Sequence, residues 1–301
     1  MEIKQLQTLL AIDEHKTFSA AARSLMTVQS NVSAHIARLE AELDVVLVDR
    51  HRGGLTDEGE IVAERARRIL HEIDDIGSDM SSLGDNVAGA CRLGSIGTTA
   101  RWLMPKMLTA LSRSHPNVAI TIYEGGTSTL IPRLLEGHLD AAIVHLPVES
   151  SEVETVQLFA EDLVLLAHSS HELADHTTIS IEELSRHSIL LPPRGSVLRK
   201  IIDRAAANKR VELSPLAEID GVRLMTSLAF ENFGPAIVPA TAIPGWIQGD
   251  FVRISVPELP RRTVGWVQRV RPRPSAPTLA VAQVALAVVK QRANRQPGVY
   301  L

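Results

Sequence analysis

The sequence predicts an α/β protein built from a small N-terminal helical domain, a long connecting helix and a larger, two-lobed α/β domain. Three observations predict this order. Two short amphipathic helices lie within residues 1–58, a heptad pattern of apolar residues follows within residues 59–89, and strand and helix patterns alternate over residues 90–301. A chain of 301 residues is long enough for several domains, each with its own core.

The two short helices form a helix–turn–helix pattern. The first spans residues 18–25 and carries an apolar face made of Phe18, Ala21, Ala22 and Leu25. The chain then breaks at Met26, and Thr27 is placed to cap the next helix. We expect that second helix to bury one continuous stripe, which consists of Val28, Val32, Ile36, Leu39 and Leu43.

The opposite face of the second helix is small and polar, so its backbone can lie deep in a DNA major groove. Gln29 is suited to pair with adenine, and Arg38 is suited to contact the phosphate backbone. The residues expected to contact DNA here are Gln29, Ser30, Asn31, Ser33, Ala34 and Arg38. An ordinary helical hairpin whose exposed face is small is the alternative at this point.

Residues 45–56 predict a small β-wing after the second helix. Residues 45–50 are mostly apolar and β-branched, Gly53-Gly54 can make a tight turn, and Leu55 returns the chain. This wing places basic side chains beside the helix, where they can contact phosphates. We expect DNA contacts here from Arg50, Arg52 and Thr56.

These segments resemble the N-terminal domain of LysR-type transcriptional regulators. The motifs are Phe18-Ser19-x-Ala21-Ala22, Leu25-x-x-x-Gln29-Ser30-x-Val32-Ser33, Ile36-x-x-Leu39-Glu40-x-x-Leu43, Leu47-x-x-Arg50 and Leu55-Thr56-x-x-Gly59. Departures are Val28 for the usual Ser, Val48 for the usual Phe and Ala34 for a usual basic or amide residue. The resemblance implies binding to double-stranded promoter DNA, a homodimer that assembles into a homotetramer, DNA bending, and contact with RNA polymerase that a small-molecule effector controls.

Net charge argues against a generic electrostatic DNA binder. The chain has a formal charge of −4, and residues 1–58 contain six Lys or Arg and nine Asp or Glu, a net charge of −3. We therefore expect the acidic side chains to point away from the groove. Non-specific DNA affinity should be weak and strongly dependent on salt.

A long helix is expected from a cap at Thr56 to about Leu83. Its apolar residues alternate in steps of four and three, the seam of a two-stranded coiled coil: Val62, Ala66, Ile69, Ile73, Ile76, Met80 and Leu83. A helix packed on its own domain is the alternative. In the family that the chain resembles, this segment is the dimerisation helix, and residues 84–90 are expected to form a hinge.

Strand and helix patterns then alternate. Strands at 92–96, 118–123 and 139–144 enclose helices at 100–113 and 130–136, which predicts a parallel, right-handed arrangement. A second set covers 163–269, and a last helix covers 278–290. The pattern resembles the effector domain of the same family, similar to the periplasmic solute-binding fold, with lobes at 90–145 plus 268–301 and at 146–267. The motifs are Gly137-x-Leu139-Asp140-x-Ala142-Ile143, Glu161-Asp162-Leu163-Val164-Leu165 and Phe233-Gly234-x-x-Ile237-Val238-Pro239.

Hydroxyl-bearing residues at the predicted helix starts indicate a ligand site between the lobes. Ligands of open α/β sheets bind beyond the carboxyl ends of strands, where helix N-termini offer free N–H groups. The candidate effector-binding residues are Thr98, Thr99, Thr127, Ser128, His145, Arg194 and Ser196, which suit a small carboxylate or another polar molecule. Thr and Ser at these positions can instead be helix caps, and Arg194 can be a solvated loop charge.

Other chemistry is poorly supported. The sequence has no nucleophile elbow and no Walker loop, and His168 and His171 have no further ligand at zinc-like spacing. The single Cys91 suits a reducing cytoplasm, as a structural residue or a redox sensor. No signal segment or apolar run near 18 residues occurs, so a cytoplasmic location without a membrane, metal or cofactor is expected. A cytoplasmic solute-binding protein or enzyme with a two-lobed fold is the alternative.

Overall fold

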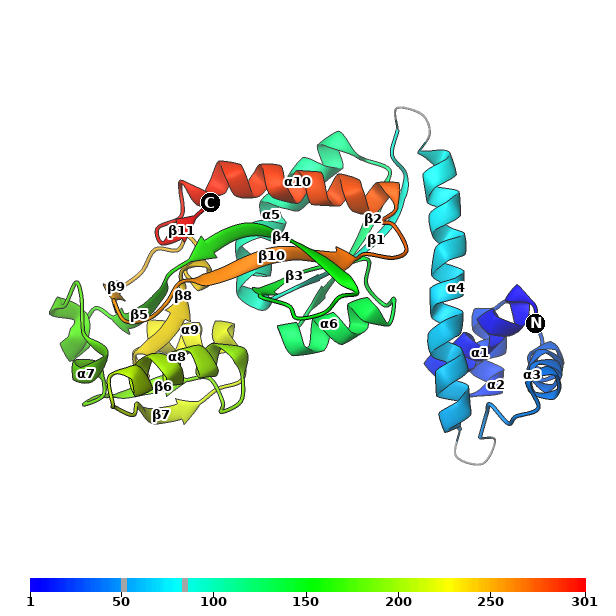
Figure 1. Cartoon of the computed structure of the whole chain (residues 1–301), viewed down its shortest axis with the longest axis horizontal. Helices are drawn as coiled ribbons and strands as arrows, with labels where there is room; N and C mark the ends of the chain where they lie inside the picture. Colours follow the sequence, from blue (N-terminus) through cyan, green and yellow to red (C-terminus); the bar gives the residue numbers. More distant parts are fainter. Residues whose placement is uncertain (50–52, 83–85) are drawn as a thin grey trace.

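The computed structural model describes residues 1–49, 53–82 and 86–301. A helical N-terminal domain consists of α1 (Ile3–His15), α2 (Phe18–Ser24) and α3 (Gln29–Leu43), and α4 (Asp57–Ser81) connects it to a domain with two β-sheets (Figure 1). This confirms the predicted fold class. Arg50, Arg52 and Leu83, for which we predict contacts, lie outside the described residues.

The N-terminal helices pack around one apolar core. Val32, Ile36 and Leu39 of α3 are fully buried in this core, but Val28 and Leu43 are 59% and 37% exposed. The buried stripe of α3 is therefore shorter than expected at both ends. The predicted cap at Thr27 is wrong, because Val28 is the N-cap residue and makes no side-chain cap bond.

The expected β-wing is reduced to an isolated antiparallel bridge between Val48 and Leu55 among the described residues. The backbone N–H of Asp49 donates to the carbonyl of Gly54 at 3.0 Å, which closes the turn. The carboxylate of Glu40 accepts the backbone N–H groups of Leu47 and Val48 at 2.9 and 3.2 Å. This part of α3 therefore anchors the base of the turn.

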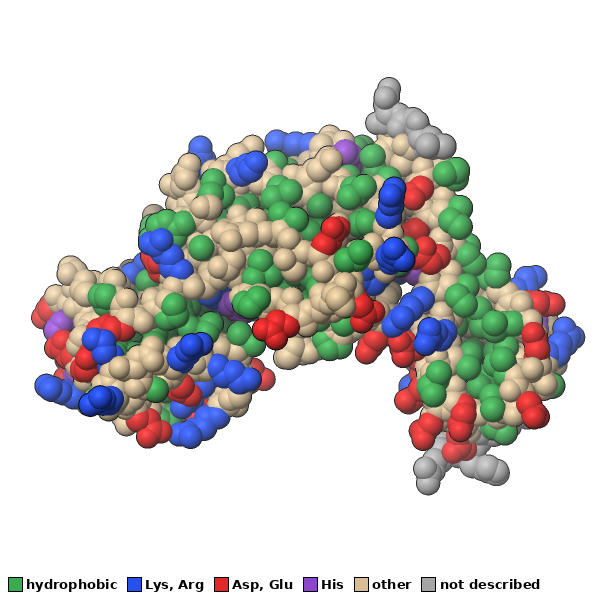
Figure 2. Space-filling view, viewed as in Figure 1, with side chains coloured by type: hydrophobic (Ala, Val, Ile, Leu, Met, Phe, Trp, Pro, Cys, Tyr) green, Lys and Arg blue, Asp and Glu red, His purple; other side chains and the backbone are tan. Residues whose placement is uncertain are grey.

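Helix α4 begins as predicted, because the Thr56 hydroxyl accepts the backbone N–H of Gly59 at 3.0 Å. Its first half packs on the N-terminal domain. Ala66, assigned to the coiled-coil seam, lies in that domain's core, and half-buried Val62 packs against it, so these two residues follow the alternative of a helix packed on its own domain. The second half exposes an apolar row along the outer side of α4 (Figure 2), which consists of Ile69, Ile73, Ile76 and Met80.

The first sheet has the strand order β11-β4-β10-β3-β1-β2. Its strands are β1 (Gly89–Ser95), β2 (Val118–Glu124), β3 (Ala141–Leu146), β4 (Val153–Glu161), β10 (Arg262–Arg269) and β11 (Val299–Tyr300). The predicted parallel pairing holds for β1 with β2 and β3, but β10 runs antiparallel to β3 and β4. Helices α5 (Gly97–Ser114) and α10 (Ala276–Ala293) cover one face, and α6 (Thr127–Leu135) covers the other (Figure 1).

The second sheet has the order β7-β6-β8-β5-β9. Its strands are β5 (Leu163–His168), β6 (Ser188–Leu191), β7 (Ser214–Glu218), β8 (Ala236–Pro239) and β9 (Phe251–Ser255). Helices α7 (Ile181–Leu184) and α8 (Val197–Asn208) share one core with it, and α9 (Val222–Phe230) shares another.

The lobe boundaries differ from those expected. Residues 153–161 and 262–267 belong to the first sheet, so the chain crosses between the lobes near residues 162 and 261 rather than at 146 and 268. Within the described ranges, no helix is both long and apolar enough to cross a membrane.

Candidate nucleic-acid interface and ligand site

Helix α3 presents the predicted DNA-contacting residues on its outer side. Gln29, Ser30, Asn31 and Arg38 are exposed, and the small side chains of Ser33 and Ala34 are half-buried between them. The buried stripe of α3 fixes this orientation, because rotation of the helix would bring its apolar side chains into water. The face is exposed and small enough to enter a groove.

Two polar side chains on this face are held by neighbours. Ser19 on α2 donates its hydroxyl hydrogen to Oε1 of Gln29 at 2.9 Å, and Nδ2 of Asn31 donates to the Thr27 hydroxyl at 3.0 Å. Thr56 is different, because its hydroxyl also donates to the carbonyl of Val46 at 2.7 Å and is thus engaged in two internal bonds. The structure gives Thr56 the role of a helix cap.

Two acidic side chains of the N-terminal domain, Asp13 and Glu42, are paired with cationic groups of the same chain. Asp13 pairs with Lys16 at 3.0 Å and with Arg67 of α4. Glu42 pairs with the N-terminal amine. These carboxylates therefore oppose a DNA phosphate less than the net charge of this region suggests.

A group of buried polar residues in the effector domain surrounds Arg262, which is the first residue of β10. Its guanidinium donates to Glu161 at 2.6 Å, to the Thr98 hydroxyl at 2.7 Å and to Nε2 of His145 at 2.6 Å. The second carboxylate oxygen of Glu161 accepts the backbone N–H of Thr241 at 2.8 Å. We call this group, Thr98, His145, Glu161, Thr241 and Arg262, the Arg262 cluster.

Burial sets the electrostatics of the Arg262 cluster. Burial, together with the charge of Arg262, holds the pKa of His145 well below its usual value, so the imidazole is neutral. Because an arginine only donates, Nε2 of His145 accepts and the ring proton is on Nδ1. The cluster then holds one cation and one anion, both almost fully buried.

Two buried hydroxyls, each on a segment that contributes to the Arg262 cluster, have no hydrogen-bond partner among the described residues. They belong to Thr99, on the first turn of α5, and to Thr241. Buried polar groups are normally satisfied, so an unpaired hydroxyl needs an explanation. A polar ligand or an ordered water at either hydroxyl would supply the missing partner.

The structure excludes the helix-cap alternative at three of the predicted positions. Helices α5 and α6 begin after Ile96 and Gly126 without any side-chain cap bond, so Thr98, Thr99 and Thr127 are not caps. The Thr127 hydroxyl accepts the backbone N–H of His145 at 3.2 Å, which links it to the Arg262 cluster.

The remaining predicted ligand residues are not brought into this cluster. Ser196 caps α8 through the backbone N–H of Arg199 at 3.2 Å. Arg194 is exposed and pairs with Glu212 at 3.0 Å, which agrees with the alternative of a solvated loop charge. Ser128 is exposed on α6.

The cleft that we expect between the two lobes is closed at the Arg262 cluster. The grooves that the structure shows, of about 1150 and 500 Å³, are lined by other residues. An exposed ion pair between Arg223 of α9 and Glu124 of β2, at 2.7 Å, also joins the two lobes. A ligand that reaches Thr99 therefore requires the lobes to move apart.

The single thiol is not suited to redox chemistry. Cys91 lies fully buried in β1, and burial raises the pKa of its thiol to about 12. Since the thiolate is the reactive form of cysteine, a group with this pKa reacts poorly near neutral pH. Cys91 is a structural residue of the first lobe.

Comparisons with known proteins assign both halves of the chain. The family model described as "Bacterial regulatory helix-turn-helix protein, lysR family" matches residues 3–60, and that of the "LysR substrate binding domain" matches residues 84–290. The chain belongs to the LysR family. It is a LysR-type DNA-binding transcriptional regulator with an effector-binding domain.

Relatives of this LysR-type regulator include proteins named for hydrogen peroxide. The "DNA-binding transcriptional dual regulator OxyR" of Escherichia coli K12 is 27% identical over 274 residues, 89% of this chain and 90% of that protein. A "probable hydrogen peroxide-inducible genes activator" of Mycobacterium leprae is 33% identical over 246 residues, 80% of this chain and 79% of that protein.

Solved structures of full-length regulators share the fold of this LysR-type chain. A single-residue variant of full-length OxyR from Pseudomonas aeruginosa has a TM-score of 0.73 at 24% identity and covers 96% of this chain and 98% of its own. Full-length CbnR complexed with its target DNA has a TM-score of 0.71 at 22% identity and covers 97% of this chain and all of its own.

Proposed function

We propose that this regulator binds promoter DNA as a homodimer, with α3 of each protomer on one half-site of a pseudo-palindrome, and that two dimers form a homotetramer. The apolar row on the second half of α4 supports the dimer, because rows of this kind seldom stay exposed to water. The solved CbnR complex shows a regulator of this fold on its target DNA. Contact with RNA polymerase and location at the nucleoid in the cytoplasm belong to the same proposal.

We further propose that the effector is a small polar or anionic molecule that binds at the Arg262 cluster. The main support comes from Thr99 and Thr241, whose buried hydroxyls have no hydrogen-bond partner within the described part of the chain. Thr99 directly follows Thr98, which binds Arg262, and the backbone N–H of Thr241 binds Glu161. The uncapped N-terminus of α5 adds free N–H groups that favour a negative charge. The effector shifts the lobes between two arrangements, and with them the geometry of the dimer on DNA.

The same proposal makes the effector a bound ligand and neither a reactant nor a cofactor. Relatives of this chain are named for hydrogen peroxide, but its one thiol is buried and has a raised pKa. We infer that the effector acts by reversible, non-covalent binding, that the protein performs no catalysis, and that Cys91 takes no part in the response.

Thr99→Val tests the effector site. The change keeps the shape of the side chain and removes a hydroxyl that has no hydrogen-bond partner among the residues described, so stability without added ligand should not fall. A panel of small carboxylates and phosphates is screened for a rise in the melting temperature of the full chain. We expect a ligand that stabilises the wild type to need roughly tenfold higher concentration in the variant, since a lost hydrogen bond to a charged group costs about 1.5–3 kcal/mol.

Thr109→Val on the same helix is the matched control, because its exposed hydroxyl bonds only to the carbonyl of Pro105. This variant should respond like the wild type. If Thr99→Val responds to the same ligand at unchanged concentrations, the effector binds elsewhere and the proposed site is wrong.

A further inference from the structure

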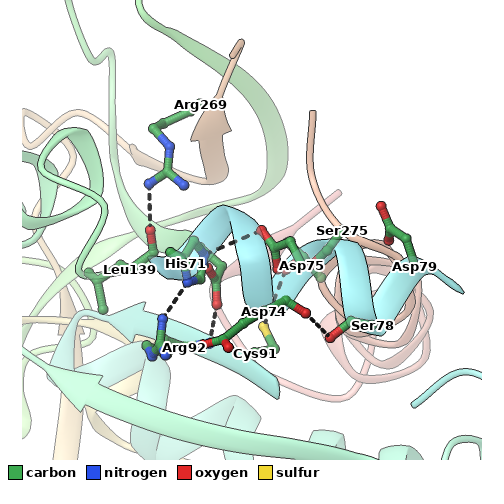
Figure 3. A network of polar contacts seen from close by, with 12 residues as sticks. His71, Asp74, Asp75, Ser78, Asp79, Cys91, Arg92, Leu139, Arg269 and Ser275 are labelled. Carbon is green, nitrogen blue, oxygen red and sulfur yellow. Dashed lines mark hydrogen bonds and ion pairs between the residues drawn. The ribbon is translucent and has the colours of Figure 1, made fainter. Parts of the chain in front are cut away.

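A buried polar network joins α4 to the first lobe and is centred on His71 (Figure 3). The imidazole of His71 contacts the carboxylate of Asp140 through Nε2 and the guanidinium of Arg92 through Nδ1, and Asp75 lies 3.5 Å from Nε2. Asp140 also accepts the backbone N–H of Arg92 at 2.6 Å. His71 and Asp140 are both more than nine-tenths buried.

The His71 network is tied to the surrounding elements on every side. Arg269, at the end of β10, donates to the backbone carbonyls of Leu134 and Leu139 at 2.6 and 2.8 Å, beside Asp140. Asp79 of α4 accepts the first backbone N–H of α10 at 2.8 Å. Burial alone lowers the pKa of His71, but the hydrogen bond and charge of Asp140 outweigh this and raise it. The two residues therefore interact strongly.

Three neighbouring strands lead from this network to the Arg262 cluster. Strands β1, β3 and β10 are paired side by side. Strand β3 follows Asp140 and contains His145, and β10 runs from Arg262 to Arg269. Strand β1 carries Arg92 in its middle and is followed by α5, whose Thr98 binds Arg262. Paired strands are stiff along their length, so a displacement at one end moves the other.

We propose that His71 is a positioning residue that transmits rearrangements of the Arg262 cluster to α4 and the DNA-binding domain. It contacts neither the DNA-binding face nor the ligand site. Its link to Asp140 and Arg92 fixes α4 on the strands that end in the cluster. The proposal rests on the proposed function only in taking the cluster as the place where the effector acts.

The test measures this coupling without ligand or DNA, so that its outcome is independent of the effector screen. Hydrogen exchange of the full chain is followed by mass spectrometry. Thr98→Val perturbs the cluster by removing an acceptor of Arg262. We expect this change to alter exchange in residues 69–81 of α4 at least threefold in an otherwise wild-type chain, and to leave it unaltered in a His71→Leu background.

Two further variants show whether the coupling depends on the hydrogen bonds of His71 or only on the packing of α4. His71→Gln keeps a donor and an acceptor, so Thr98→Val should still alter exchange in α4 in this variant. The same is expected in Arg65→Leu, which changes an exposed position on α4. If His71→Leu does not fold, Asp140→Asn, which has the same shape without the charge, takes its place. The proposal is overturned if Thr98→Val has no effect on α4 in the wild-type background, or the same effect in every background.

Discussion

Replacing Ile69 and Ile76 by glutamate is expected to convert the protein to a monomer that no longer holds a two-half-site operator. These side chains are 41% and 62% exposed in the single chain, and in a dimer they face the same seam of the partner. Unpaired charges buried in that seam cost about 3–5 kcal/mol, which weakens dimerisation at least a hundredfold. Sedimentation velocity gives the oligomeric state, and titration with operator DNA gives the affinity.

Arg65→Glu is the control for the added charge, because Arg65 is exposed on α4 and lies outside the apolar row. This variant should remain dimeric. Should the Ile69→Glu, Ile76→Glu protein also sediment as a dimer, the apolar row of α4 is not the dimer contact, and another surface must join the protomers.

Arg262→Met is expected to destabilise the effector domain strongly. The change leaves the carboxylate of Glu161 fully buried without its ionic partner, at a cost of about 3–5 kcal/mol. For a domain of this size such a loss lowers the melting temperature by roughly 6–20 °C. Differential scanning calorimetry of the full chain measures this shift.

A second substitution and a neighbouring residue make this prediction specific. Arg262→Met combined with Glu161→Leu removes both charges and should recover much of the stability. Arg261→Met breaks the exposed pair with Asp162, 2.9 Å apart, and should leave the melting temperature nearly unchanged. A small effect of Arg262→Met, equal to that of Arg261→Met, would show that the Glu161 carboxylate is solvated.

Local patterns predict the helices of this regulator well, and tertiary contacts explain most of what they miss. The stripe of α3 follows from a 3.6-residue period, the apolar row of α4 from a heptad spacing, and the cap at Thr56 from the residue type. The cap at Thr27 fails because α3 begins at Gln29, so the N-cap position falls on Val28. The sequence pattern does not predict helix α1, because buried Gln5 and Thr8 interrupt its apolar face.

The proposed ligand site is likewise predicted only in part by local patterns. The hydroxyls at Thr98, Thr99 and Thr127 follow from their position after predicted strands, and the structure brings Thr98 and Thr127 together with His145. Glu161 and Asp140 occur in the effector-domain motifs, but nothing in the sequence pairs Glu161 with Arg262, because the two are 101 residues apart and meet only where the chain crosses between the lobes. Nothing pairs Asp140 with His71 either, because these residues meet only where α4 packs on the first lobe.

The small polar face of α3 is expected to read two half-sites of promoter DNA. The most direct test is to incubate the full chain with fragmented genomic DNA and to sequence the bound fragments. We expect a few enriched promoter fragments that share an inverted repeat, with half-sites about one helical turn or a multiple of it apart. In a Gln29→Ala, Ser33→Ala variant the enrichment should fall, since each lost base contact costs about 1–3 kcal/mol. Equal enrichment by both proteins, or none by either, would show that this face of α3 does not read promoter DNA.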